Sequence, residues 1–434
     1  MVKSYANVTL TSLSGDLEVT VFLPEGIGSN EDPSDFFYRS TRFEHGSMIG
    51  GIRRTTVGGR AHKLYGADMW RTPHDPLWPE SGLGLASEFG IGDDGSFCFF
   101  RCGWHEVDDV TNGLLGYPEA KPGEPFLKIG VGKLIKGSCA ACDSTDDYKF
   151  NSPYEFASKP HWDFSQPSVD TIVLEHQETL AKDGYKLRKE ISLEANVLRV
   201  QSTLTNLGST SFSTAWYSHH FFSCDRKPIG PVYSVDMGLQ PQDNFGPYED
   251  QSWAIPLTNY ATVQTSGDTV FVEMVREIEH GVRIKAEFNP DLNTKGTFTI
   301  SACETSIVED IAEFVDEPYD PISMYAFNLY MERTTISPEP QLFIRLAPGQ
   351  SKTWTQRLAI TDDLKLGPTI PDQSYPQQLS LTAAELAPSL FIDPRKHLVA
   401  ATFFVAFVCL SLLFMTRRSD VRRQEYTQLP DSMF

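Results

Sequence analysis

Two adjacent histidines, His219 and His220, lie within a run of aromatic residues near the middle of the chain. The run reads Trp-Tyr-Ser-His-His-Phe-Phe, and a strand-like sequence precedes it. Imidazole can donate or accept a proton near neutral pH, which suits acid–base chemistry. Neighbouring residues of a strand point to opposite faces, so only one of the two rings can face a given site. A core histidine bonded to the backbone is the alternative interpretation.

A carboxylate, Glu332, lies more than a hundred residues further along the chain, at the end of a predicted strand. A proline-bearing loop is expected directly after it, followed by another strand, residues 346–354, with a turn in its middle at Pro348-Gly349. A carboxylate and an imidazole that flank one substrate can remove one proton and deliver another in a single step. Such a step needs no metal and no cofactor, and we expect neither.

Composition excludes some partners. The 434 residues carry a formal net charge of -20, which argues against nucleic acid because phosphate contacts need Lys and Arg. Hydrophobic residues make up 40% of the chain and charged residues 22%, as in a globular protein. Aromatic residues reach 12%, which fits both a β-rich fold and a sugar-binding site.

Hydrophobic periodicity predicts strands almost throughout residues 1–360. The clearest case is residues 185–205, where Leu187, Ile191 and Leu193 share one face and polar residues share the other. Residues 36–43 also alternate as a strand does. Many strands with short polar turns predict an all-β fold, and we expect one large antiparallel β-sandwich over residues 1–360.

The C-terminal part has a different character. Residues 361–396 are proline-dotted and polar, as in a linker, whereas residues 398–415 are uncharged and mostly apolar. That length is near the ~20 residues that cross a bilayer, so we expect a transmembrane helix over residues 397–416. The basic tail, residues 417–434, would be cytosolic and the β domain lumenal or extracellular. No secretory signal is visible, and a tail-anchored arrangement would leave the β domain in the cytosol.

Seven cysteines are present, of which Cys409 lies in the predicted membrane segment. The other six could be free thiols or could form disulfides in an oxidising compartment. Zinc is the alternative for the two close pairs, which are Cys98 with Cys102 and Cys139 with Cys142.

The two chemical stretches resemble motifs of the galactose mutarotase (aldose 1-epimerase) superfamily. In that family a glutamate at a strand end precedes a proline loop, and a histidine is followed by aromatics. Residues 204–208, Leu-Thr-Asn-Leu-Gly, resemble the strand end before that histidine. The resemblance spans roughly residues 35–360. Within the superfamily, the sequence is similar to a less-studied bacterial branch. It implies a β-supersandwich, with His219 as the acid that protonates the ring oxygen and Glu332 as the base.

The bacterial branch also suggests residues that hold the sugar. Its segments resemble residues 38–43, 88–90 and 126–132, which contain Arg42, Glu88 and Lys128. We expect at least two of these three beside His219, and His220 is a further candidate for substrate binding. The alternative is structural: Lys128 as a solvated strand residue and Arg42 as one half of an ion pair.

Two functions from different classes follow. The first is an enzyme that interconverts the anomers of a hexose or sugar derivative. The second is a membrane-tethered carbohydrate-binding module without epimerase activity. The sequence departs from the family motifs, because Ser218 replaces the asparagine before His219 and Arg333 replaces the glutamine after Glu332. The family's first histidine and its middle aspartate have no assigned counterpart.

Overall fold

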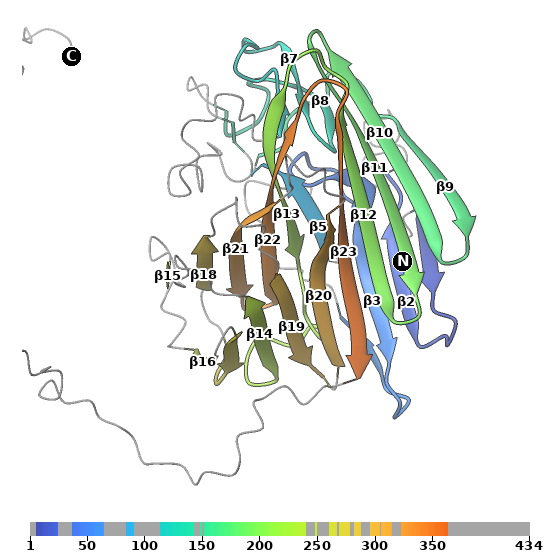
Figure 1. The fold of residues 1–434 in the computed structure, drawn as a ribbon, viewed down its shortest axis with the longest axis vertical. Helices are drawn as coiled ribbons and strands as arrows, with labels where there is room; N and C mark the ends of the chain where they lie inside the picture. Colours follow the sequence, from blue (N-terminus) through green and yellow to red (C-terminus); the bar gives the residue numbers. More distant parts are fainter. Residues whose placement is uncertain are drawn as a thin grey trace, which may run out of the picture. The chain divides into compact units, whose positions relative to one another are not determined.

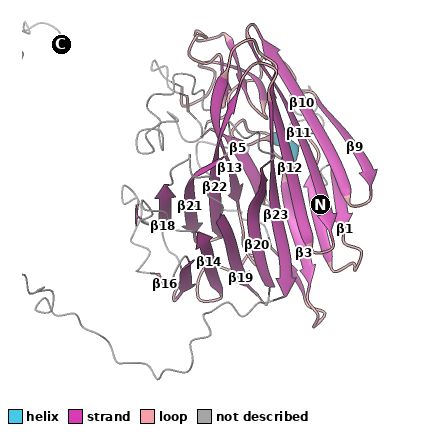
Figure 2. Ribbon diagram, in the orientation of Figure 1, coloured by secondary structure: helices cyan, strands magenta, loops and turns pink. Residues whose placement is uncertain are grey.

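A computed structural model describes part of the chain. The described residues are 6–24, 37–64, 84–90, 113–142, 148–149, 152–239, 248–249, 260–266, 269–277, 282–287, 296–303, 305–314 and 323–362. All their strands lie in one compact unit, Met1–Pro368. Their strand pairs are antiparallel, and their one helix is a 3-10 turn, η2 (His45–Ser47), so the expectation of an all-β antiparallel fold is confirmed (Figure 2).

The strands form two large sheets and one small sheet (Figure 1). The first sheet has, in spatial order, β1 (Asn7–Thr11), β2 (Leu17–Phe22), β3 (Ile49–Thr55), β5 (Leu85–Phe89), β13 (Phe212–His220), β22 (Thr335–Leu346), β21 (Ser323–Glu332), β18 (Val282–Glu287) and β15 (Tyr248–Glu249), with β4 (Ala61–Lys63) paired to β3. The second has β16 (Ala261–Ser266), β17 (Thr269–Met274), β14 (Tyr233–Leu239), β19 (Gly296–Ala302), β20 (Thr305–Phe314), β23 (Ser351–Asp362), β12 (Val197–Asn206), β11 (Asp183–Glu194), β10 (Thr171–Leu180) and β9 (Trp162–Ser168). The small sheet has β6 (Leu114–Leu115), β7 (Pro125–Lys128) and β8 (Gly132–Ile135).

The pair β11–β12 shows why this sequence forms strands. Its residues alternate between buried and partly exposed, and Leu187 pairs with Leu204 on the buried face. Between the two strands Ala195 takes a positive φ of 53°, which closes the turn that the sequence predicted there. One buried and one solvated face is the usual condition of an antiparallel sheet.

The two large sheets pack against each other through one hydrophobic core. Trp216 of β13 and Trp354 of β23 meet across the layers, with ring centroids 5.2 Å apart. Both rings are almost completely buried, so this contact removes a large apolar area from water. The even-numbered residues of β13 therefore face the interior, and the odd-numbered ones face the other side of the first sheet.

Two local predictions are wrong. Residues 37–44 contain no strand, because the Tyr38 hydroxyl accepts hydrogen bonds from the backbone N–H groups of Arg42 and Phe43 and folds the segment back. The proline-bearing loop after Glu332 is instead the first half of β22, which begins at Thr335.

The predicted linker, transmembrane helix and basic tail all follow Asp362 and lie outside the described residues. Within the described part, no helix has the length and apolar character that a membrane span requires. The membrane segment at 397–416 and the orientation of the chain therefore stay predictions.

Candidate functional site

The side chains of His219 and Glu339 meet on the face of the first sheet that points away from the second. Nε2 of His219 lies 3.3 Å from Oε1 of Glu339, and both side chains are 7% exposed. Ser337 completes the group, because its hydroxyl lies 3.2 Å from Nδ1 of His219 and donates to Glu339 at 3.1 Å. A protonated imidazole donates at both nitrogens, so this arrangement suits a histidine that carries a proton to deliver.

Pairing between β13 and β22 brings these residues together. Tyr217 pairs with Gln341, and Phe222 bridges to Ile336, so the same register sets His219 opposite Glu339. On its other side β13 pairs with β5, where His219 lies opposite Ala86. Because the alanine side chain is small, Phe43 and Phe221 can pack against the imidazole.

Aromatic rings fix the imidazole of His219. Phe221 stacks on it with centroids 4.3 Å apart, and Phe43 meets it edge-on at 5.4 Å. Tyr330 of β21 lies on the third side at 6.3 Å. The ring thus has a defined orientation before any substrate arrives, which a proton donor needs.

The strand pair is interrupted next to this site. Phe222 and Ile336 exchange two backbone hydrogen bonds, at 3.1 and 2.9 Å. In an antiparallel ladder the next exchanging partners would be residues 338 and 340 of β22, and both are proline, which has no N–H to donate. His219 and Glu339 lie within this gap in the ladder.

A second polar cluster adjoins the first. Glu88 of β5 accepts from Lys128 Nζ at 2.8 Å, from Tyr217 Oη at 2.7 Å and from Arg42 Nε at 3.1 Å. The Arg42 guanidinium also donates to the Tyr217 hydroxyl at 3.2 Å and lies over the ring of Phe43. The structure thus brings together Arg42, Glu88 and Lys128, although they are far apart in the sequence.

Burial and the neighbouring charges shift the pKa values of this cluster, and burial is the largest cause in each case. Burial lowers the pKa of Lys128, although the nearby Glu88 carboxylate acts to raise it. Burial also lowers the pKa of Arg42, but the nearby Tyr217 and Glu88 outweigh it and hold the pKa above its ordinary value. Burial and the Glu88 charge raise the pKa of Tyr217, which therefore stays a neutral donor. Lys128 is 1% exposed and hence is not the solvated strand residue of the alternative interpretation.

Glu332 lies on the same face as His219 but further along it. It pairs with Thr335 at the end of β21, whereas Asn328 of β21 pairs with Glu339. At the usual strand spacing Glu332 is therefore displaced by about 13 Å along the strands and by two strands across the sheet. Its Oε2 accepts from the N–H of Arg333 at 3.4 Å.

His220 faces the interior between the two large sheets. It is fully buried, its Nε2 lies 2.9 Å from Nε2 of Gln356 on β23, and Phe222 stacks on its ring. The two adjacent histidines therefore point to opposite faces, as the strand period requires.

A second buried ion pair, between Lys189 of β11 and Glu44, packs against the interior face of β13. Lys189 Nζ lies 2.6 Å from Oε2 of Glu44, and neither side chain is exposed. Trp216 donates its indole N–H to Oε1 of Glu44 at 2.8 Å, and Lys189 donates to the Ser87 hydroxyl at 3.1 Å. This pair lies on the far side of β13 from His219.

Sequence patterns missed Glu339, Ser337 and Tyr217. Glu339 lies between Pro338 and Pro340, and Ser337 directly precedes Pro338. These prolines favoured a loop and hid the alternation of Ser337, Glu339 and Gln341 along one face of β22. Tyr217 lay within the aromatic run but gave no signal beyond a buried strand. Alternation with His219 would have been the cue, because residues two apart on a strand share a face.

Four cysteines belong to the described residues. They form the disulfides Cys139–Cys142 and Cys224–Cys303. The other members of the predicted cysteine set, Cys98, Cys102 and Cys409, lie outside the described residues, so a zinc site that joins the two close pairs stays untested.

No family model matches the chain, and no curated protein matches it. Solved structures do. A putative aldose 1-epimerase from Escherichia coli K12 is 14% identical with a TM-score of 0.41, over 82% of this chain and 99% of that one. A galactose mutarotase-like protein from Lactobacillus casei is 12% identical with a TM-score of 0.41, over 82% and 100%. A galactose mutarotase related enzyme from Lactobacillus acidophilus is 10% identical with a TM-score of 0.45, over 83% and 100%. At such identity the reaction has to be argued from the site itself.

Proposed function

We propose that His219 and Glu339 form an acid–base pair that interconverts the anomers of a hexose or hexose derivative. The observation that carries the proposal is their direct contact at 3.3 Å, on a strand face where aromatic rings orient the imidazole. A buried carboxylate and imidazole side by side, next to further polar groups, form the arrangement that proton-transfer chemistry needs.

The reaction uses one proton movement at each residue. Glu339 takes the proton of the anomeric hydroxyl while His219 delivers a proton to the ring oxygen, and the bond between the anomeric carbon and the ring oxygen breaks. The open-chain aldehyde then rotates about its first carbon–carbon bond. The same two residues run the steps in reverse on the other face of the carbonyl, which restores their protonation states.

Two adjacent strands suit this task. The anomeric hydroxyl and the ring oxygen are bonded to the same carbon, so the acid and the base must reach two neighbouring atoms. His219 and Glu339 are cross-strand neighbours, whose side chains start about 5 Å apart. We assign the base to Glu339 and not to Glu332, because Glu332 is displaced by four residues along the strands.

The second cluster would hold the sugar hydroxyls. Arg42, Lys128 and Tyr217 provide N–H and O–H donors, and Glu88 provides acceptor oxygens, all in surroundings of low polarity. Hydrogen bonds to charged groups contribute about 1.5–3 kcal/mol each, so a few of them suffice to bind a sugar in one orientation.

The test measures anomer exchange by NMR for the full-length chain over a panel of hexoses, deoxyhexoses and hexose phosphates. We expect at least one sugar whose anomers exchange faster with the protein than without it. We expect the Glu339→Gln variant to bind that sugar without catalysing exchange. If the unaltered protein binds sugars and exchanges none, the chain is the carbohydrate-binding module of the alternative function. If no sugar binds, both functions fail.

A further inference from the structure

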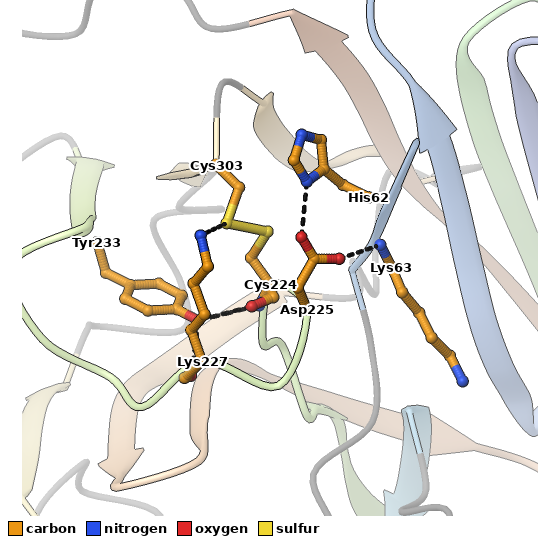
Figure 3. Close-up of a disulfide and its surroundings, with 7 residues drawn as sticks. All are labelled: His62, Lys63, Cys224, Asp225, Lys227, Tyr233 and Cys303. Atoms are coloured by element: carbon orange, nitrogen blue, oxygen red, sulfur yellow. Dashed lines mark hydrogen bonds and ion pairs between the residues drawn. A yellow bond between two sulfur atoms is a disulfide. The ribbon is translucent and has the colours of Figure 1, made fainter. Parts of the chain in front are cut away.

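The disulfide Cys224–Cys303 lies beside a histidine and an aspartate, and all four residues are of types that bind metal ions (Figure 3). Cys224 follows β13, Cys303 lies between β19 and β20, and His62 comes from β4. One potential ligand atom from each of His62, Cys224, Asp225 and Cys303 lies within 4.8 Å of the others. We propose that reduction of this disulfide creates a tetrahedral site for a zinc-like divalent cation, with these four residues as its ligands.

The oxygen and nitrogen ligands are already in position. Asp225 Oδ2 lies 2.8 Å from Nδ1 of His62, and its other oxygen accepts the backbone N–H of Lys63 at 2.9 Å. The hydrogen bond from Lys63 orients the carboxylate before any ion binds, as hydrogen bonds from surrounding residues do in metal sites, and the ion would take the place of the proton between Oδ2 and Nδ1. His62 is 3% exposed, and its Nδ1, which would be the ligand atom, points toward Asp225 (Figure 3).

The sulfur ligands fit the same centre once the disulfide is open. Their Cα atoms are 6.3 Å apart, and two thiolates on one zinc ion, each at about 2.3 Å, need only a modest separation from disulfide distance. The Asp225 side chain is 34% exposed and gives an ion a route from solvent.

Charge favours a divalent cation at this position. Two thiolates and one carboxylate carry three negative charges, a divalent ion leaves one, and Lys227 Nζ lies 3.6 Å from the Cys303 sulfur to balance it. A nearby ammonium also favours the thiolate over the thiol. Two sulfurs, one imidazole and one carboxylate in tetrahedral positions are a ligand set that zinc accepts.

The redox step balances with a dithiol reductant. The reductant's two thiols transfer two electrons and two protons to Cys224 and Cys303, and the reductant leaves as its own disulfide. The cation then displaces the two thiol protons. Because Cys224 adjoins the first sheet and Cys303 the second, the cross-link between the sheets would be a disulfide under oxidising conditions and a metal ion under reducing ones.

The test titrates Co²⁺ into the full-length chain carrying Cys139→Ser and Cys142→Ser, which removes the other described disulfide. We expect the reduced protein, kept free of oxygen, to show thiolate-to-cobalt charge transfer and tetrahedral d–d bands. We expect the oxidised protein to show neither. In this background Cys224→Ser with Cys303→Ser should abolish the bands, and His62→Asn should weaken Co²⁺ binding at least tenfold.

A second measurement guards against misfolded variants. X-ray absorption at the zinc edge of the reduced, zinc-loaded protein with natural cysteines at 224 and 303 should show two sulfur and two lighter neighbours. Zinc should also raise the melting temperature of the reduced protein and leave that of the oxidised protein unchanged. The proposal is overturned if the reduced chain shows no thiolate band, if the band survives loss of Cys224 and Cys303, or if four sulfurs surround the ion.

Discussion

Similar residues lie against the two faces of β13, but their surroundings differ. On each face a buried glutamate meets a buried lysine: Glu88 with Lys128 on the face of His219, and Glu44 with Lys189 on the interior face. Glu88 has two further partners, Arg42 and Tyr217, and lies beside a histidine–carboxylate contact. The interior pair has an indole and a hydroxyl and is sealed between the sheets. Both pairs are buried, so the neighbouring His219–Glu339 contact, and not burial of charge, is the reason for which we propose a site on the first face.

The largest expected effect is on the reaction. Glu339→Gln and His219→Asn should each lower anomer exchange by about 10² to 10⁴, because each removes one proton transfer. Sugar affinity should stay, since the amide keeps the shape of the carboxylate. NMR exchange and binding titrations measure both quantities.

Glu332→Gln is the matched control on the same face, and its exchange rate should not change. The double variant His219→Asn with Glu339→Gln should be little slower than either single variant, because residues that act as a unit are not additive. A large loss with Glu332→Gln and none with Glu339→Gln would move the base back to Glu332.

The two ion pairs should differ in their contribution to stability. Lys189→Met leaves the Glu44 carboxylate buried with the Trp216 N–H as its one side-chain donor among the described residues, and breaking a buried pair in this way costs about 3–5 kcal/mol. Lys128→Met leaves Glu88 with Arg42 and Tyr217, so its cost should be clearly smaller. Urea unfolding of the two variants gives the comparison, and equal losses would contradict it.

A further prediction concerns His45, which is buried away from solvent. Burial lowers the pKa of His45 from 6.5 to about 4, and its Nε2 is already bonded to the Ser40 carbonyl. Between pH 6.5 and 4 the unfolded chain takes up a proton that the folded chain refuses. The free energy of unfolding should therefore fall as the pH is lowered through this window, by about 3 kcal/mol from His45 alone.

Chemical denaturation at several pH values measures this slope. His45→Gln should flatten it, while His161→Gln, at an exposed position, should leave it unchanged. Some slope will remain, because burial also lowers the pKa of His176. An unaltered slope in the His45 variant would contradict the assignment.

The smallest effect concerns His220. Because its ring faces the interior and contacts Gln356, His220→Asn should change anomer exchange far less than the hundredfold or more expected at His219. Some stability should be lost with the buried contact. A rate loss equal to that of His219→Asn, in a variant that melts normally, would place His220 in the reaction.

Periodicity was enough to predict the antiparallel β fold and the opposite orientation of the two histidines. It failed where backbone chemistry overrides side-chain pattern. Two prolines made residues 337–340 look like a loop, although β22 passes through them with its neighbours' register intact. Residues 36–43 looked like a strand, because the alternation of their side chains does not reveal that the Tyr38 hydroxyl bends the segment.

Some residues of the candidate site could be proposed from the sequence, and others could not. Arg42, Glu88 and Lys128 were proposed from short local segments, and the structure brings them into one cluster. Their role in binding a sugar stays a prediction. Glu339, the base that we propose, could not be reached from the sequence, because only the register between β13 and β22 places it opposite His219.

The prolines of β22 also bear on how the site would admit a substrate. His219 and Glu339 touch each other, so a sugar oxygen can enter only if they separate. A continuous ladder resists that separation with every backbone hydrogen bond, each contributing about 0.5–1.5 kcal/mol net. Pro338 and Pro340 remove two donors where the strands would have to part. The pair β13–β22 thus has fewer backbone hydrogen bonds beside His219 and Glu339, while the bonded pairs on either side keep the two strands aligned.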